Sequence, residues 1–258
     1  MSRLYLFFLL SALAVGCSSK PGDKLRVGME LAYPPFEMTD EKGEPKGVSV
    51  DLARELGKFL GKEVQIQNTA FDGLIPALKT GRIDLIISSM TATPERAQSI
   101  DFSEPYVKTG LCLLVSKNSP VRSIQDLDQP GKIIAVKQGT TGQTYAVNSI
   151  KTAKVLVLDM ETAGVLEVVQ GKADGFIYDQ MSTYSNWKRN PETTRPILKP
   201  FKEESWAVGL RKGDTELLSE VNRFLKDFRA RGGFEQLGDR HLKEQKEAFR
   251  QMGYPFYF

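Results

Sequence analysis

The sequence contains little cysteine and histidine, which excludes several kinds of site. Two cysteines and one histidine occur in 258 residues, too few for a multi-disulfide scaffold, a four-thiolate zinc site or a histidine-rich metal site. We therefore expect no metal and no cofactor. An excess of one charge sign is also lacking, because 35 Lys and Arg face 32 Asp and Glu, a balance that does not indicate a nucleic-acid partner. The composition is that of a globular protein, with a length that suits two domains of roughly 100 residues each.

The first residues have the pattern of an export signal. Residues 1–16 carry Arg3, the apolar run Leu4–Leu10 and then small residues, which is typical of a secretory signal peptide. The run is too short to span a bilayer comfortably, and no later segment approaches 18 uninterrupted apolar residues. We expect the mature chain to be exported.

Lipidation is predicted at the end of this signal. The stretch Ala14-Val15-Gly16-Cys17 resembles a bacterial lipobox, although Ala14 stands where leucine is usual. Residues 1–16 are therefore predicted to be a lipoprotein signal peptide, Cys17 the lipidation site and residues 17–23 a polar tether. The alternative is a plain signal peptide with Cys17 incidental. We expect Cys112, in an apolar run, to be a small buried hydrophobe and His241, among charges, to lie on the surface.

Apolar segments of strand length alternate with segments of helical periodicity. The predicted strands are Leu25–Met29, Val64–Gln67, Asp84–Ser88, Gly110–Ser116, Lys132–Lys137, Val155–Leu158, Gly175–Tyr178 and Trp206–Leu210. The stripe Val48, Leu52, Leu56, Phe59 and Leu60 predicts one helix. Asp72 and Thr162 are predicted N-caps of two others. This alternation implies largely parallel sheets covered by helices on both faces.

Two stretches of the sequence match each other ninety residues apart. Leu78–Ile86 and Val168–Phe176 both read as a helix end, then Gly-x-x-Asp, then a buried strand. The same distance beyond each strand lies Ser89 in the first and Asp179 in the second. One interpretation is a common turn signature that recurs by chance. The other is two similar lobes that face each other across a cleft.

Polar and aromatic residues follow the predicted strands at their carboxyl ends. Because open α/β sheets bind ligands at this edge, these residues are candidates for a binding site. They are Glu30, Tyr33 and Phe36 after the first strand, Phe71 after the second, Ser88, Ser89, Met90, Thr91 and Arg96 after the third, and Lys137, Thr140, Thr141 and Asp179 in the second half.

The charges of this set match a free α-amino acid. Arg96 can hold a carboxylate through two parallel hydrogen bonds, and Thr140-Thr141-Gly142 opens a predicted helix whose free N–H groups favour an anion. Asp179 complements an ammonium group. A free amino acid carries both charged groups on one carbon.

Each candidate also has a purely structural alternative. Arg96 could pair with a neighbouring acid, Glu95 or Asp101. Asp179 could be the N-cap of a helix over Gln180–Trp187. The rings of Tyr33 and Phe36, beside two prolines, could pack a loop onto the core. Several of these alternatives would have to hold together for the cleft interpretation to fail.

Residues 24–242 resemble the polar amino-acid class of extracellular solute-binding proteins of ABC importers. The stretches that carry the resemblance follow one another in order: Leu25-Arg26-Val27-Gly28, Tyr33-Pro34-Pro35-Phe36-Glu37, Phe71 to Leu78, Ser88 to Arg96, Ile100-Asp101-Phe102-Ser103, Gln138-Gly139-Thr140-Thr141 and Asp174 to Asp179. The ordered set covers nearly the whole mature chain. It implies the type II periplasmic-binding fold, an α/β protein with two Rossmann-like lobes joined by a two-strand hinge.

The resemblance also implies roles for the candidate residues. Arg96, with Thr91 and the backbone of Ser89, looks like the α-carboxylate clamp, aided by Thr140 and Thr141. Asp179 looks like the α-ammonium partner, and the rings of Tyr33 and Phe71 look like the pair that sandwiches the ligand side chain.

The lobes implied by the family are discontinuous in sequence. Residues 24–108 and 206–258 would form lobe 1 and residues 109–205 lobe 2, with hinge strands near Lys108–Leu111 and Glu204–Ala207. The segment Lys243–Phe258 departs from the family, which usually stops after Leu242. It could pack on the first lobe or present its aromatic residues to a partner.

Two charges bear on which amino acid would bind. Glu30 lies where basic-amino-acid binders place an acid for the ligand's cationic tail, and Ser88-Ser89 resembles their serine pair. Lys137 lies where glutamine binders place a lysine for the side-chain amide. If both face the ligand they largely cancel, which favours a neutral polar side chain such as that of glutamine. If Lys137 turns to solvent, Glu30 favours arginine or lysine.

The sequence therefore predicts a substrate-binding lipoprotein of an amino-acid ABC transporter. We expect a monomer anchored by lipid at the periplasmic or extracytoplasmic face of a bacterial membrane. It would close over its ligand by hinge bending and deliver it to the permease subunits, and it would not be an enzyme. The alternative is a cyclohexadienyl (prephenate or arogenate) dehydratase-like enzyme on the same fold, with Glu30 and Lys137 in acid–base roles.

Overall fold

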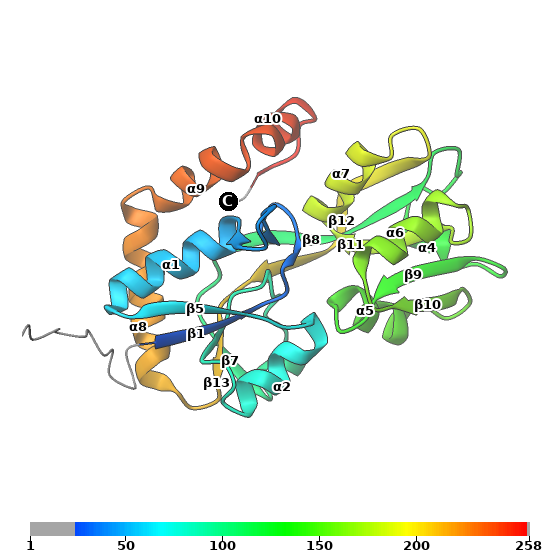
Figure 1. Ribbon diagram of the computed structural model, residues 1–258. Helices are drawn as coiled ribbons and strands as arrows, with labels where there is room; N and C mark the ends of the chain where they lie inside the picture. Colours follow the sequence, from blue (N-terminus) through cyan, green and yellow to red (C-terminus); the bar gives the residue numbers. More distant parts are fainter. Residues whose placement is uncertain (1–23, 257–258) are drawn as a thin grey trace, which may run out of the picture.

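The computed structural model describes residues 24–256. The predicted signal peptide, the lipidation site Cys17 and the tether lie outside the described residues. Two five-stranded sheets organise the chain, and helices cover them to form two lobes (Figure 1). This is the predicted α/β architecture, and the strand-rich band between the lobes is the predicted hinge.

The first lobe surrounds a sheet with the strand order β5-β1-β6-β13-β7. Its strands are β1 (Lys24–Met29), β5 (Glu63–Asn68), β6 (Leu85–Ile86), β7 (Ile100–Phe102) and β13 (Gly209–Arg211). Its helices are α1 (Val48–Leu60), the 3₁₀ turn η1 (Phe71–Gly73), α2 (Leu74–Lys79), α3 (Pro94–Ala97), α8 (Thr215–Ala230), α9 (Gly233–His241) and α10 (Lys243–Gln251). A small second sheet consists of β2 (Ala32–Tyr33), β3 (Glu37–Thr39) and β4 (Pro45–Lys46).

The second lobe surrounds a sheet with the order β10-β9-β11-β8-β12. Its strands are β8 (Val107–Ser116), β9 (Ile133–Lys137), β10 (Lys154–Leu158), β11 (Gly175–Asp179) and β12 (Thr194–Trp206). Its helices are α4 (Ile124–Leu127), α5 (Thr141–Ser149), α6 (Glu161–Val169) and α7 (Gln180–Arg189). In each sheet three adjacent strands, β5-β1-β6 in the first and β10-β9-β11 in the second, run parallel to one another.

The internal repeat marks equivalent turns in the two lobes. In the first lobe, Oδ2 of Asp84 accepts a hydrogen bond from the backbone N–H of Arg26 on β1, at 3.0 Å. In the second, Oδ2 of Asp174 accepts one from Ile133 on β9, at 2.8 Å. Each aspartate thus ties a helix-to-strand turn to the neighbouring parallel strand, which supports the interpretation as two similar lobes.

The segments that connect the lobes were only partly predicted. β8 and β12 run antiparallel, with Thr109 opposite Glu204 and Val107 opposite Trp206. The single predicted strand Trp206–Leu210 is wrong, because Trp206 ends β12 in the second sheet and Gly209 begins β13 in the first. The chain changes sheets between these two residues.

Two predicted helix caps are also wrong. Helix α2 has Gly73 at its N-cap, and the carboxylate of Asp72 instead accepts a hydrogen bond from Gln138. Helix α6 begins at Glu161, one residue before Thr162, so Thr162 lies inside it. Neither helix has a side-chain hydrogen bond at its N-cap.

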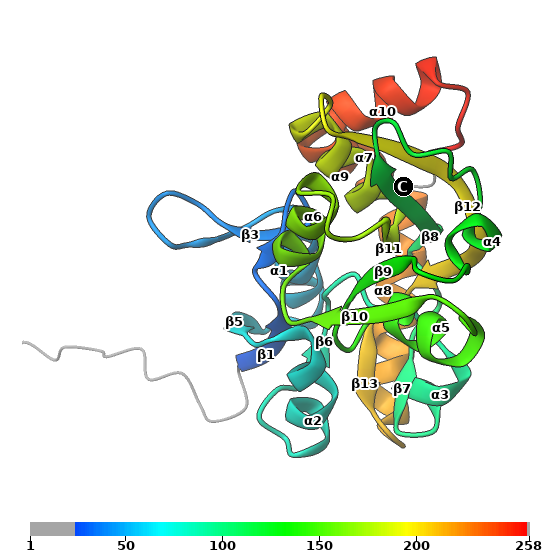
Figure 2. The same cartoon turned by 90° about the vertical axis from the view of Figure 1, so that its right-hand side faces the viewer.

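The C-terminal segment packs against both lobes. Phe249 of α10 is 1% exposed. Its ring lies 5.3 Å from that of Tyr184 on α7 in the second lobe, and it also contacts Tyr254 and Phe256. In two views at right angles, α7, α9 and α10 lie at the same end of the molecule (Figures 1 and 2).

Two side chains singled out in the sequence have clear surroundings. Cys112 on β8 is fully buried, as predicted. His241 is not a surface residue, because its side chain is 12% exposed and Nε2 lies 2.8 Å from Oδ2 of Asp51 on α1. The packing of α9 on α1 covers it. Among the described residues, no helix has the length and apolar character needed to cross a membrane.

Candidate functional site

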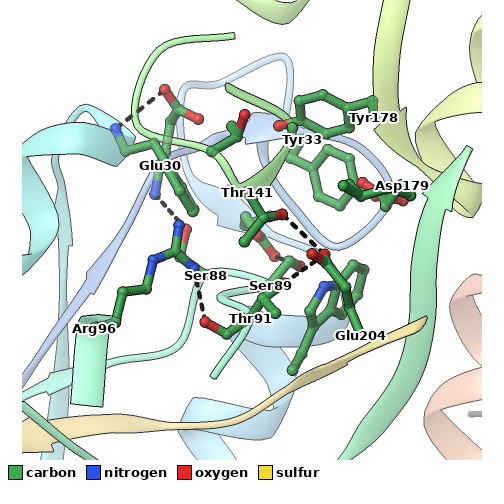
Figure 3. Close-up of a pocket in the computed structure, with 16 residues that line it drawn as sticks. Glu30, Tyr33, Ser88, Ser89, Thr91, Arg96, Thr141, Tyr178, Asp179 and Glu204 are labelled. Carbon is green, nitrogen blue, oxygen red and sulfur yellow. Dashed lines mark hydrogen bonds between the residues drawn. The ribbon is translucent and has the colours of Figure 1, made fainter. Parts of the chain in front are cut away.

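A pocket lies between the two lobes, where the carboxyl ends of their parallel strands face each other (Figure 3). It is lined by Glu30, Tyr33, Glu37, Phe71, Ser88, Ser89, Thr91, Arg96, Leu111, Thr140, Thr141, Gly142, Tyr178, Asp179, Glu204 and Trp206. Most of the candidate residues predicted from the sequence are therefore brought together in one place. The lining comes from both lobes and from the hinge strands β8 and β12.

Three candidate residues lie behind this lining. Phe36 is 1% exposed and stacks on the ring of Tyr33, with the ring centroids 5.6 Å apart. Met90, also 1% exposed, packs in the core around α2. Lys137 lines a neighbouring cavity, which it shares with Glu30 and Phe71. Phe36 and Met90 thus support the pocket from the core, as the packing alternative for Phe36 predicted.

Arg96 reaches the pocket from the short helix α3. Thr93 caps this helix by accepting a hydrogen bond from the N–H of Arg96. The guanidinium donates through Nη1 to the carbonyl of Thr91 at 2.7 Å and through Nη2 to the carbonyl of Gly139, in the other lobe, at 2.9 Å. Its carbon lies 5.5 Å from the centroid of the Phe71 ring. Both bonds go to neutral carbonyls, so the cation retains its charge for an anion in the pocket.

Of the two acids considered as partners of Arg96, Asp101 pairs with another residue. Asp101 pairs with Lys212, whose Nζ lies 2.7 Å from Oδ1. Burial lowers the pKa of Arg96, and the carboxylates of Glu204 and Glu95 act in the opposite direction. A partly buried guanidinium of this kind is a strong site for a carboxylate, because burial reduces the competition from water.

Asp179 is both a helix cap and part of the pocket wall. It is the N-cap of α7, and Oδ1 accepts from the N–H groups of Met181 at 2.9 Å and Ser182 at 3.1 Å. The hydroxyl of Tyr33 donates to the same oxygen at 2.6 Å. The structural alternative is therefore confirmed, yet the carboxylate also lines the pocket. Burial raises the pKa of Asp179 to about 6, although these three hydrogen bonds act to lower it.

Glu30 and Lys137 form an ion pair between the lobes. Nζ of Lys137 contacts Oε2 of Glu30, and the two side chains are 4% and 16% exposed. The other carboxylate oxygen, Oε1, accepts from the N–H of Phe71 at 3.3 Å. Lys137 also lies over the Phe71 ring, 5.6 Å from its centroid. The two charges that were considered for ligand selectivity thus neutralise each other.

The sequence analysis missed another acid of the lining, Glu37. It is 1% exposed, and its Oε2 accepts from the hydroxyl of Ser89 at 3.2 Å. Burial raises the pKa of Glu37 to about 8, even though the hydrogen bond from Ser89 lowers it. The carboxyl group is therefore largely protonated at neutral pH. Glu37 lies in the stretch Tyr33-Pro34-Pro35-Phe36-Glu37, which carries part of the family resemblance, and this position could have marked it as a candidate.

The lobes are closed over the pocket. Besides the bonds of Arg96, Tyr33 and Lys137 to the opposite lobe, Nε2 of Gln138 donates to Oδ2 of Asp72 at 2.7 Å. The pocket of this two-lobed protein thus has an arginine on one side, a carboxylate on the other and aromatic rings in its lining, an arrangement that is complementary to a small zwitterion.

Comparison with known proteins agrees with this class. Residues 25–244 match the family "Bacterial extracellular solute-binding proteins, family 3", and the chain belongs to this family. It is 30% identical over 244 residues to the ABC transporter arginine-binding protein 1 of Escherichia coli (strain K12), which covers 93% of this chain and 98% of the relative. It is 29% identical over 229 residues to the ABC transporter glutamine-binding protein GlnH of Bacillus subtilis (strain 168), with 87% of this chain and 83% of the relative covered.

A solved structure shares the fold. The ancestral amino acid-binding protein AncCDT-1, a precursor of cyclohexadienyl dehydratase, superimposes with a TM-score of 0.79 at 35% identity, covering 85% of this chain and 95% of the other. The predicted type II periplasmic-binding fold is thereby confirmed.

Proposed function

We propose that this protein captures a free polar L-amino acid in the interlobe pocket and delivers it to the permease of an ABC importer. One observation carries the proposal: the partly buried Arg96 and the buried Asp179, two ionisable groups of opposite sign, line opposite sides of one pocket. An α-amino acid presents the matching pair of charges. The two relatives are named as an arginine-binding and a glutamine-binding protein, which supports the same ligand class.

The carboxylate of the ligand would lie against Arg96. Close to this guanidinium, Thr140 caps helix α5, and the N–H groups of Thr141 and Gly142 occupy its first turn. These N–H groups favour an anion. The ammonium group would meet Asp179, and the side chain would extend between Tyr33 and Phe71 toward Glu30.

A neutral polar side chain, with glutamine first, fits the far end of the pocket. Glu30 lines this end, and Lys137 pairs with it from the neighbouring cavity, so the two charges compensate each other. An amide that donates to Glu30 and accepts from Lys137 would leave no charge unpaired. The second candidate is arginine, which the acid Glu30 and the arginine-binding relative favour. It would require Lys137 to leave a position where its side chain is 4% exposed.

Hinge bending would open and close the pocket. The boundaries we propose are residues 24–108 and 206–258 for lobe 1 and 109–205 for lobe 2, since the chain changes sheets close to these positions. Ligand contacts from both lobes would shift the population toward the closed form. The closed monomer is then the form that docks on the permease.

Export and lipid anchoring complete the proposal. The lipobox-like stretch before Cys17 supports attachment to the extracytoplasmic face of a bacterial membrane. In a bacterial host, the full chain should fractionate with membranes, and Cys17→Ser should appear in the soluble fraction. Equal membrane association of both proteins would remove the lipid anchor from the proposal.

The experiment that tests the ligand class is a thermal-shift screen followed by calorimetry on residues 24–258. The panel holds the twenty amino acids, prephenate and arogenate. We expect stabilisation by glutamine or arginine, with a dissociation constant in the micromolar range or below, which requires about 8 kcal/mol of net binding free energy. A protein that none of the twenty amino acids stabilises would contradict the proposal.

The alternative on this fold is a dehydratase-like enzyme. Glu37 favours it, because a buried carboxyl group with a pKa of about 8 carries a proton near neutral pH that a general acid can donate. The proposal of a binding protein rests instead on Asp179, which suits an ammonium group. Turnover of prephenate or arogenate, followed by the appearance of the aromatic product, would replace the binding proposal with the enzymatic one.

A further inference from the structure

Glu204 lies on the hinge strand β12 and was not among the residues predicted to contact a ligand. It lines the pocket and is 8% exposed. Its two oxygens differ in their surroundings, because Oε1 has no hydrogen-bond partner among the described residues. A buried acceptor left without a donor is costly, and here it borders a cavity that a ligand can enter.

The other oxygen, Oε2, connects the two lobes. It accepts from the hydroxyl of Thr91 at 3.1 Å and from the hydroxyl of Thr141 at 2.9 Å (Figure 3). A threonine hydroxyl has one proton to donate. Because both protons point to Glu204, these hydroxyls offer lone pairs to the pocket and do not donate to a ligand carboxylate. Glu204 thus converts two neutral groups into acceptors.

Asp179 lies on the same side of the pocket as Glu204. Figure 3 shows both carboxylates entering opposite Arg96. Burial and, more weakly, the charge of Glu204 raise the pKa of Asp179, so the two acids are within electrostatic reach of each other. Two carboxylates and two hydroxyl lone pairs form a region rich in acceptors, which is the chemistry that recognises a primary ammonium group.

We propose that Glu204 is a second ammonium-binding residue, whose Oε1 holds the ligand's α-ammonium together with Asp179. The assignment rests on the proposed function as an amino-acid binder. It also gives the hinge a role in recognition, because the ammonium binds the carboxylate that already holds one hydroxyl from each lobe. The ligand's ammonium group and the hydrogen bonds formed when the lobes close then involve the same side chain, that of Glu204.

The test compares each amino acid with its analogue that lacks the amino group. Calorimetry measures L-glutamine against glutaramic acid, and L-arginine against 5-guanidinopentanoic acid, on the wild type and on Glu204→Gln. The variant keeps the size of the side chain but removes the charge. We expect it to lose at least about tenfold in affinity for the amino acid while the des-amino analogue changes by less than about threefold. Glu203→Gln, the adjacent exposed acid, is the matched control and should change neither.

The outcomes separate this assignment from the proposed function. Equal losses for the amino acid and its analogue, or no loss for either, would overturn the role of Glu204 while leaving amino-acid binding in place. A wild type that binds no amino acid would overturn the proposed function and the assignment with it. If Glu204→Gln does not fold, Glu204→Asp retains the charge and should still discriminate the amino acid from its analogue by more than about tenfold, whereas loss of that discrimination would count against the proposal.

Discussion

The hydroxyl of Tyr33, in the first lobe, donates a 2.6 Å hydrogen bond to Oδ1 of Asp179, in the second. The bond links Tyr33, one of the two rings predicted to flank the ligand side chain, to Asp179, the predicted partner of the ligand's ammonium group. It also opposes the effect of burial, which raises the pKa of Asp179 to about 6. One contact therefore joins the lobes and adjusts the charge of the site.

Ligand affinity should depend on pH through Asp179. The ionised carboxylate binds an ammonium, so protonation competes with the ligand. As the pH falls below about 6, affinity should decline by up to about tenfold per pH unit. Calorimetry between pH 4.5 and 8 measures the midpoint.

Tyr33→Phe should move that midpoint upward, because the lost hydrogen bond had stabilised the ionised form. Tyr178→Phe, another aromatic residue of the lining, is the control and should leave the midpoint in place. A midpoint that stays the same in Tyr33→Phe would count against ammonium binding by Asp179.

Removal of Lys137 should change which amino acid is preferred. Lys137→Met leaves Glu30 as a partly buried carboxylate without its cationic partner. The ratio of arginine affinity to glutamine affinity should then rise by about tenfold or more, since a cationic side chain offsets the desolvation of Glu30. Competition titrations with both amino acids measure the ratio. Lys172→Ala, on the exposed surface, serves as the control, and an unchanged ratio in Lys137→Met would place the pair outside the ligand's reach.

The C-terminal segment should contribute to stability. Phe249 is 1% exposed and contacts Tyr184, so Phe249→Ala removes a packed ring and should lower the free energy of unfolding by about 3–5 kcal/mol. Met252, in the same segment, is 36% exposed, and Met252→Ala should change stability by less than about 0.5 kcal/mol. Denaturant titration compares the two. Equal and small effects would show that α10 does not share the core.

Much of the architecture was accessible from the sequence because it depends on local patterns. The stripe from Val48 to Leu60 is a helix, and Gly61, with a φ of 65°, ends it in the left-handed conformation. The Gly-x-x-Asp repeat was informative because Asp84 and Asp174 make the same hydrogen bond in the two lobes. The candidate site followed from the rule that ligands bind at the carboxyl ends of parallel strands.

The features that were missed depend on contacts between distant segments. β12 contains Pro196 and Pro200 in a charged stretch, so no alternating pattern marks it, and its pairing with β8 determines the strand. Glu204 lies in the run Lys202-Glu203-Glu204, which is typical of a solvated surface. Glu204 lines the pocket because β12 pairs with β8 between the two lobes. His241 is covered in the same way by the packing of α9 on α1.

The most direct test of amino-acid binding is the affinity of Arg96 variants for L-glutamine and L-arginine. Arg96→Ala removes the carboxylate partner from a lining that both lobes share. We predict that it lowers affinity for the amino acid by at least ~100-fold, with a melting temperature in the absence of ligand that stays near the wild-type value. Arg82→Ala, an exposed arginine, should bind like the wild type. An Arg96→Ala protein that binds its amino acid with wild-type affinity would contradict the account.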